Sequence, residues 1–133
     1  MDKFWKQFKS GTDIRGVASE GVAGQKINLT DEVMEKICAG FVLWLSKKAN
    51  KPADQLIISV GHDSRISASR IQAAVTRALE PAGVTVYDCG LASTPSMFMT
   101  TVDLKCDGAV QITASHHPFN RNGLKFFTPD GGL

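Results

Sequence analysis

The densest group of reactive side chains in this chain of 133 residues lies near its end, between Thr113 and Lys125. The stretch holds a hydroxyl, two adjacent imidazoles, a guanidinium and an ammonium, on Ser115, His116, His117, Arg121 and Lys125. A serine is a weak nucleophile at neutral pH unless a base or an electrophile assists it. Ser115 is therefore a candidate nucleophile or phosphate carrier, and a polar loop that only connects two strands is the alternative.

Two other chemistries fit this stretch poorly. A serine hydrolase of the nucleophile-elbow type has the pattern Gly-x-Ser-x-Gly, whereas the residues around Ser115 read Thr-Ala-Ser-His-His. His116 and His117 form an adjacent pair, but no further carboxylate or cysteine stands at the spacing of a metal site. We therefore disfavour a hydrolase elbow and a histidine metal centre.

Two further loops contain groups that can bind an anion. In the first, from Gly11 to Gly16, glycines let backbone amides approach a phosphate, and Arg15 can bind its oxygens with two hydrogen bonds. Taken alone, this loop is weak evidence for an anion site, and a plain turn explains it better. The second loop runs from Gly61 to Arg65. In it we expect Asp63 and Arg65 to pair with each other or to cap the following helix.

Hydrophobic periodicity and capping residues predict an alternation of helices and strands. We expect a helix over Asp31–Ala49 with Thr30 as its N-cap, a second with Ser67 as its N-cap, and a short third with Thr94 as its N-cap. Four strands are expected, over Leu56–Val60, Val84–Cys89, Gly108–Thr113 and Leu124–Phe127. Residues 4–8 read as a short edge strand and residues 10–24 as a glycine-rich loop.

This order of elements predicts the fold class. Strands joined through helices favour a parallel sheet, but the last two strands are only about ten residues apart, which suits an antiparallel pair. We expect an α/β fold, a three-layer domain with a mixed, mainly parallel four-stranded sheet between helices. In such sheets functional residues gather in loops at the carboxyl ends of strands, here after Val60, Cys89 and Thr113.

Composition limits the classes of partner. The length suits a single domain, and a net charge of +2 gives no basic field for nucleic acid or a membrane surface. Three widely spaced cysteines favour reduced thiols in the cytoplasm. No signal peptide is recognisable, and the longest apolar run, Phe41–Leu45, is too short to span a bilayer.

Taken together, the loops resemble the N-terminal domain of the α-D-phosphohexomutases, the phosphoglucomutase and phosphomannomutase family. Five segments occur in the family's order and rough spacing over essentially the whole chain: Gly11–Gly16, Gly61–Arg65, Ser93–Pro95, Thr113–Pro118 and Asn122–Lys125. The serine motif is specific, and the others are individually weak but jointly strong. The resemblance implies that residues 1–133 are the first of four domains, the later three being absent from this chain.

The resemblance also implies a mechanism. Ser115 would be a phosphoserine that exchanges its phosphoryl group with a hexose phosphate through a bisphosphorylated sugar, interconverting the 1- and 6-phosphates. Arg15, His116 and Lys125 fall on positions that the family uses around the phosphoserine and the reacting hydroxyl. Mg²⁺ would bind an oxygen of the phosphate on Ser115 and aspartates of the second domain. The chain alone is expected to be an inefficient mutase.

One departure and one rival accompany the resemblance. The family usually has asparagine where this chain has His117, which affects the detail of the serine loop rather than the serine itself. The loop from Gly11 to Gly16 lacks the extra glycine of many glucosamine-type members, which favours glucose or mannose as the sugar. The rival is a non-catalytic module that binds phosphate or a phosphosugar, and a serine hydrolase is a more distant third.

Overall fold

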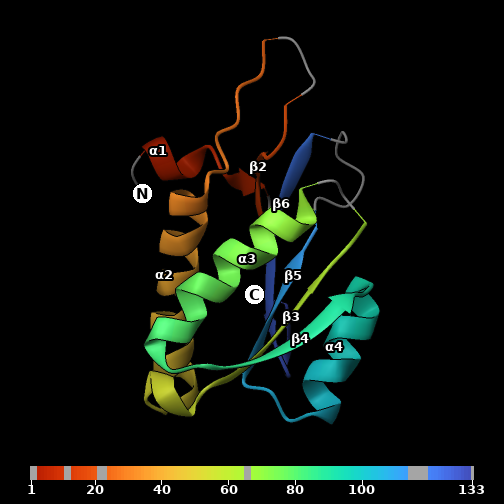
Figure 1. Ribbon diagram of the computed structural model, residues 1–133. Helices are drawn as coiled ribbons and strands as arrows, with labels where there is room; N and C mark the ends of the chain where they lie inside the picture. The colour runs from red at the N-terminus through yellow and green to blue at the C-terminus, as the bar shows by residue number, and fades with distance from the viewer. Residues whose placement is uncertain (1–2, 11–12, 21–23, 65–66, 114–119, 133) are drawn as a thin grey trace.

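The computed structural model describes residues 3–10, 13–20, 24–64, 67–113 and 120–132. Helices α2 (Asp31–Ala49) and α3 (Ala68–Leu79) cover one face of a central sheet, and α4 (Thr94–Asp103) covers part of the other (Figure 1). A short helix, α1 (Lys3–Lys6), precedes the first strand. The expected α/β domain, with a mixed sheet between helices, is confirmed.

The sheet contains five strands of at least five residues and two strands of two residues. The long ones are β2 (Asp13–Val17), β3 (Ile57–His62), β4 (Thr85–Leu91), β5 (Gly108–Ile112) and β6 (Arg121–Thr128), and the short ones are β1 (Lys9–Ser10) and β7 (Gly131–Gly132). Their order is β1-β2-β6-β5-β3-β4, with β7 pairing to β6. Strand β3 pairs in parallel with β4 and β5, whereas β6 pairs antiparallel with β5 and β2.

The main core lies between the sheet and the pair α2 and α3. Both helices bury an apolar stripe, and the sheet presents alternate residues of each central strand to them. A smaller cluster on the opposite face joins Met97 of α4 to Ala109 and Phe127. Helices therefore pack against both faces of the sheet, and this packing holds the strands that carry the polar loops in place.

The helix ends follow the expected chemistry in part. Thr30 caps α2 as expected, because its hydroxyl accepts a hydrogen bond from the Val33 amide at 3.3 Å. The cap of α4 is Ser93 rather than Thr94, since the Ser93 hydroxyl accepts from the Ser96 amide at 3.2 Å. Ser67 occupies the N-cap position of α3 without making a capping bond.

Two strand expectations near the N-terminus were wrong. The segment Phe4–Phe8 is not an edge strand, since α1 runs through its first residues and the rings of Phe4, Trp5 and Phe8 pack together. The expected loop over residues 10–24 contains β2, so the sheet has five long strands rather than four. Parallel and antiparallel pairings of the long strands are consequently equal in number. Besides the two-residue strand β1, the partner of β2 is β6, more than a hundred residues away, so local composition did not reveal it.

Candidate active site

Asp13, Arg15 and Lys125 lie on the face of the sheet that α4 partly covers. Successive side chains of a strand alternate between the two faces. Ile14 packs against the core beneath α2 and α3, so its neighbours Asp13 and Arg15 point to the other face. Phe126 also packs against that core, which places Lys125 on the face of α4.

The Asp13 carboxylate contacts both of these cations. Its Oδ2 atom accepts a hydrogen bond from Nη2 of Arg15 at 3.1 Å, and Nζ of Lys125 lies 3.4 Å from Oδ2 and 3.5 Å from Oδ1. Arg15 is 3% exposed, although arginine is rarely buried so fully. Its Nη1 atom donates to the Ile14 carbonyl at 2.8 Å. The arrangement places two positive groups on adjacent strands around one carboxylate.

Gly123 leaves room for the Arg15 side chain and for the backbone of β2. Arg15 and Gly123 are opposite each other in the antiparallel pair of β2 and β6. A Cβ atom at position 123 would overlap the Ile14 carbonyl oxygen and would stand 2.8 Å from Cδ of Arg15. The glycine in the Asn122–Lys125 segment is therefore required by the close approach of β2.

The carboxyl ends of β3 and β5 meet beside this group. The Thr113 amide, just beyond β5, donates to the Gly123 carbonyl at 3.0 Å, so Thr113 and Arg15 lie on opposite sides of Gly123. The Thr113 hydroxyl donates to Oδ2 of Asp63 at 2.8 Å. Asp63 thus links the end of β3 to the residue from which the chain continues toward Ser115.

Asn122 joins β6 to the start of α3. The residue is fully buried, its Nδ2 atom donates to the Ser67 hydroxyl at 3.0 Å, and its Oδ1 atom accepts from the Gly123 amide at 2.9 Å. Ser67 itself has a helical backbone conformation rather than the extended one of a capping residue, and its hydroxyl makes no bond to its own helix. The bond with Asn122 fixes the N-terminus of α3 relative to the strand that carries Gly123 and Lys125.

The structure brings two of the four expected site residues together. Arg15 and Lys125 meet at Asp13, whereas Ser115 and His116, like His117, lie outside the described residues. Asp13 was not singled out from the sequence, although its position two residues before Arg15 on a strand would have placed both on one face. That inference needed β2 to be recognised as a strand.

The three cysteines are poor candidates for a nucleophile, because only a thiolate reacts readily. Burial, with a smaller contribution from Glu35, raises the pKa of Cys38 to about 12. Burial is also the largest cause of the raised pKa values of Cys89 and Cys106. All three are free thiols, and their raised pKa values favour the protonated form at neutral pH.

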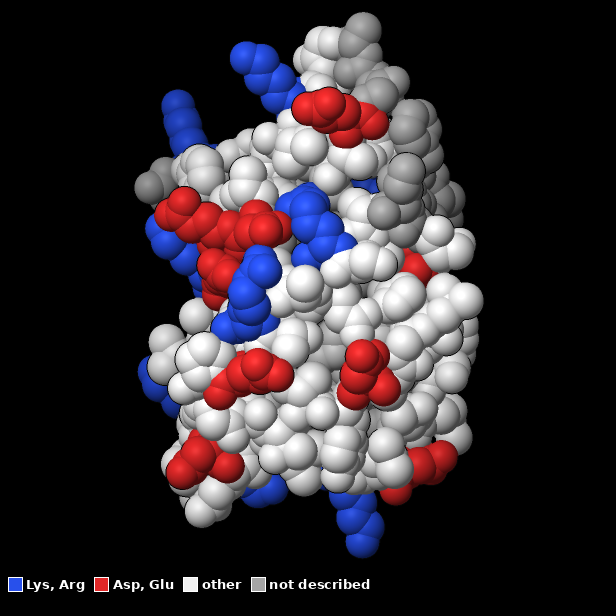
Figure 2. Space-filling view, in the orientation of Figure 1, with Lys and Arg blue, Asp and Glu red and all other residues white. Residues whose placement is uncertain are grey.

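Charges elsewhere on the molecule are mixed. Figure 2 shows acidic and basic side chains interspersed over α2 and α3, and the pairs there include Arg70 with Asp31 at 2.7 Å and Arg77 with Glu35 at 3.3 Å. Within the described ranges, no group of three histidine, cysteine, aspartate or glutamate side chains is arranged to hold a metal ion. No helix among those residues is long and apolar enough to cross a membrane.

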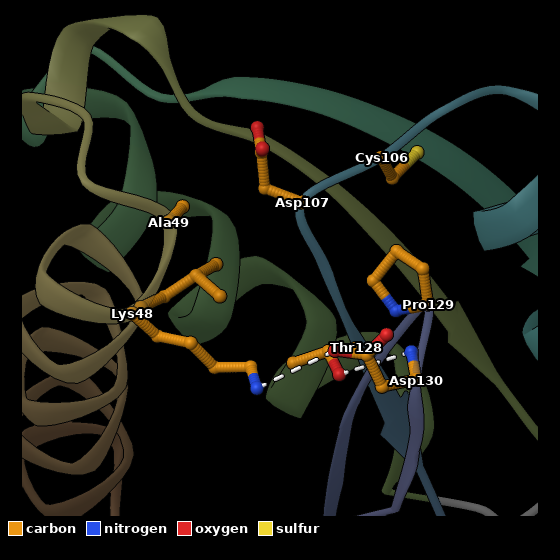
Figure 3. Close-up of a pocket in the computed structure, with 8 residues that line it drawn as sticks. Lys48, Ala49, Cys106, Asp107, Thr128, Pro129 and Asp130 are labelled. Atoms are coloured by element: carbon orange, nitrogen blue, oxygen red, sulfur yellow. Dashed lines mark hydrogen bonds and ion pairs between the residues drawn. The ribbon is translucent and has the colours of Figure 1, made fainter.

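A hollow of about 240 Å³ lies at the opposite end of β5 and β6 from Arg15 (Figure 3). Its lining includes Lys48, which is paired with Asp130 at 3.5 Å, and Asp107, which is paired with Lys51 at 2.8 Å. The lining thus carries one cation against the two carboxylates of Asp107 and Asp130, so the hollow is a weaker candidate for a phosphate site than the group around Asp13.

The family described as "Phosphoglucomutase/phosphomannomutase, alpha/beta/alpha domain I" has a sequence model that matches residues 6–133. The chain belongs to this family. It is therefore an N-terminal domain of the phosphohexomutases, and the resemblance read from the five loop segments is confirmed. The match also agrees with the sheet between helices described above.

Several curated phosphohexomutases are similar to the chain. A phosphoglucosamine mutase of Geobacillus thermodenitrificans is 38% identical over 124 residues, which are 91% of this chain and 25% of that protein. The phosphoglucosamine mutase of Campylobacter fetus is 36% identical over 121 residues, with the same coverage. The chain therefore spans about a quarter of the length of these relatives.

Solved phosphohexomutase structures share the fold. A protein assigned as a phosphomannomutase from Thermus thermophilus superposes with a TM-score of 0.75 and 25% identity, over 95% of this chain and 27% of that one. A phosphoglucomutase/phosphomannomutase family protein from Burkholderia thailandensis gives a TM-score of 0.67 and 25% identity, over 89% and 25% of the two chains.

Proposed function

We propose that this chain is the phosphoserine-bearing domain of an enzyme that interconverts hexose 1-phosphate and hexose 6-phosphate. The observation that supports this most directly is the position of Thr113, two residues before Ser115, across β6 from Arg15 with Gly123 between them. A phosphate on that serine would carry a charge of about −1.5 to −2 at neutral pH. A buried guanidinium close to the carrier would stabilise that charge.

The proposed reaction consists of two phosphoryl transfers. In the first, the bond between phosphorus and Ser115 Oγ breaks while a free hydroxyl oxygen of the sugar monophosphate bonds to phosphorus. The hydroxyl loses its proton to a base, and Ser115 Oγ regains one. The resulting bisphosphate turns over in the site, and its other phosphoryl group returns to Ser115. We assign Arg15 and His116 to the phosphoserine and Lys125 to proton exchange with the hydroxyl.

Magnesium fits this scheme as a group shared with the rest of the enzyme. The described residues contain no cluster of three ligating side chains, so this chain would supply an oxygen of the phosphate on Ser115. The remaining ligands would be carboxylates of a second domain, since oxygen ligands suit Mg²⁺. The metal would neutralise charge on the transferring phosphoryl group.

The names of the relatives bear on the sugar. The absence of an extra glycine in the Gly11–Gly16 loop favours glucose or mannose, whereas the curated relatives named above are phosphoglucosamine mutases. We propose that the substrates are a hexose phosphate and its bisphosphate. Because the relatives are phosphoglucosamine mutases, we favour an amino sugar as the hexose. Comparing kcat/KM for glucose, mannose and glucosamine phosphates in the full-length protein decides between them.

The partners and location in this proposal follow from the same observations. The remaining domains of a longer enzyme would be the partner of this chain, because the relatives are about four times its length. A cytoplasmic location would suit three free cysteines that form no disulfide. Neither nucleic acid nor a membrane surface is expected, given the net charge of +2.

The proposal is tested by Ser115→Ala in the full-length protein. We expect mutase activity to fall to background even when the sugar bisphosphate is supplied, because alanine has no atom to carry the phosphoryl group. Arg15→Ala and Lys125→Ala should retain residual activity, since they act through charge and position. Steady-state kinetics measure the rates, and intact mass measures the covalent phosphate on protein purified from cells.

Ser69→Ala serves as the matched control, because Ser69 is exposed on α3 and its loss should leave both activity and phosphate unchanged. Near-normal turnover by Ser115→Ala would exclude the phosphoserine mechanism. Absence of both activity and covalent phosphate in the unmodified protein, with retained binding of a phosphosugar, would favour the non-catalytic binding module instead.

A further inference from the structure

The Asp13 carboxylate holds the two cations of the proposed site in a single cluster. We infer that Asp13 is a positioning residue, which holds Lys125 beside Arg15 for the transferring phosphoryl group; this inference rests on the proposed function. The contacts that carry it are 3.1 Å to Nη2 of Arg15 and 3.4 Å to Nζ of Lys125, both from Oδ2 of Asp13.

The register of β2 and β6 brings these side chains together. Ile14 is paired with Leu124, so the antiparallel ladder sets Asp13 opposite Lys125 and Arg15 opposite Gly123. Residues opposite each other on one face of an antiparallel pair are close enough for opposite charges to interact. Asp13 also stands two residues from Arg15 on the same face, so a single carboxylate reaches both cations without any loop in between.

Burial differs across the cluster and indicates what the carboxylate contributes. The side chains of Arg15, Asp13 and Lys125 are 3%, 19% and 33% exposed. A guanidinium remains charged in proteins and is costly to bury without an opposite charge. Asp13 supplies that charge to Arg15 and at the same time separates Arg15 from Lys125, which would otherwise be like charges on neighbouring strands.

One carboxylate between two cations leaves the cluster with one positive charge in excess. That excess favours a phosphoryl group, which carries negative charge on its oxygens. Lys125 is the partner that can turn toward such a group, because its contacts with Asp13 are the longer ones and its side chain is the more exposed. Arg15 has a second bond, to the Ile14 carbonyl, and stays in place.

A double-mutant cycle shows whether Asp13 acts on kcat through Lys125 or only supports the structure. The full-length protein is compared with Asp13→Asn, Lys125→Met and the double variant. We expect Asp13→Asn to lower kcat by roughly tenfold to a hundredfold, the scale for a misplaced catalytic group. The KM for the sugar phosphate should change little, since the lost interaction would act on the transferring group.

In the Lys125→Met background the Asp13→Asn change should lower kcat by only about threefold or less, because the group that it positions has already gone. An undiminished loss of kcat in that background would overturn the inference and leave Asp13 as a purely structural residue. If Asp13→Asn does not fold, the cycle is repeated with Asp13→Glu, which keeps the charge but moves it by one methylene. The same coupling with Lys125 is then expected.

Asp107→Asn is the matched control, because Asp107 is also a partly buried carboxylate paired with a lysine, Lys51, but lies at the far end of the sheet. It should lower the unfolding midpoint and leave kcat unchanged. If the unmodified protein has no mutase activity, the proposed function fails. If it is active and Asp13→Asn matches it in kcat, only the inference about Asp13 fails.

Discussion

At the scale of single residues, the glycines of this chain differ in what the fold requires of them. Gly123 lies beneath the Arg15 side chain and against the backbone of β2. Gly40 lies on the exposed side of α2, and a Cβ atom there would meet nothing within 4 Å. Replacing glycine by alanine should therefore change the free energy of unfolding in opposite directions at the two positions.

We predict that Gly123→Ala lowers the free energy of unfolding by about 1–3 kcal/mol, the usual range for overpacking, because the obstructing Ile14 carbonyl cannot move without breaking the β2–β6 pair. Gly40→Ala should raise it by about 0.5–1 kcal/mol, since glycine is unfavourable inside a helix. Urea denaturation measures both. Equal stability of Gly123→Ala and the unmodified protein would mean that β2 does not approach β6 as closely as described.

At the scale of elements, α2 is the helix whose ends follow most directly from its sequence. Thr30 caps its start, and Asp31 and Glu32 stand in the first turn, where the helix dipole favours negative charge. Asn50 ends it in the left-handed conformation, with a φ of 54°. These signals are local, which explains why Asp31–Ala49 was predicted with its observed bounds.

Thr30→Ala should lower the free energy of unfolding by about 1 kcal/mol, because the Val33 amide loses the hydroxyl that it donates to. Thr30→Ser keeps the hydroxyl and should recover most of that loss. Chemical denaturation followed by far-ultraviolet circular dichroism provides the comparison. A serine variant as unstable as the alanine variant would show that the Thr30 methyl group, rather than the cap, provides the stability.

At the scale of the whole molecule, under the proposed function this chain supplies only part of the active site, and other domains supply the rest. Its two cations lie at one end of the sheet, and the described residues lack a metal cluster. The curated relatives are about four times as long. Preorganised groups can each contribute about a hundredfold or more to a rate, so groups missing from one domain should reduce turnover severely.

We predict that the isolated 133-residue chain does not convert glucose, mannose or glucosamine 1-phosphate to the 6-phosphate, even with Mg²⁺ and the corresponding bisphosphate present. A coupled assay measures the conversion, and circular dichroism shows whether the chain is folded under the same conditions. The full-length protein at equal concentration is the positive control. Turnover by the folded chain at a rate near that of the full-length protein would contradict the proposed division of the site between domains.

The sequence alone determined the elements whose signals are local. The caps and apolar stripe of α2, the β-branched run in β3 and the short connection between β5 and β6 each lie within a few residues of one another, so the α/β class and the antiparallel pair could be predicted. The order of the five motif segments along the chain likewise indicated the family.

Tertiary structure decided what depends on pairing across the chain. Strand β2 contains Arg15 and Gly16 and resembles a loop by composition, and most of its residues are paired with the distant strand β6. That ladder also creates the contact of Asp13 with Lys125, which are 112 residues apart in sequence. The family motifs predicted Arg15 and Lys125 as cations for one phosphate, whereas the carboxylate between them became visible only once the register of two distant strands was known.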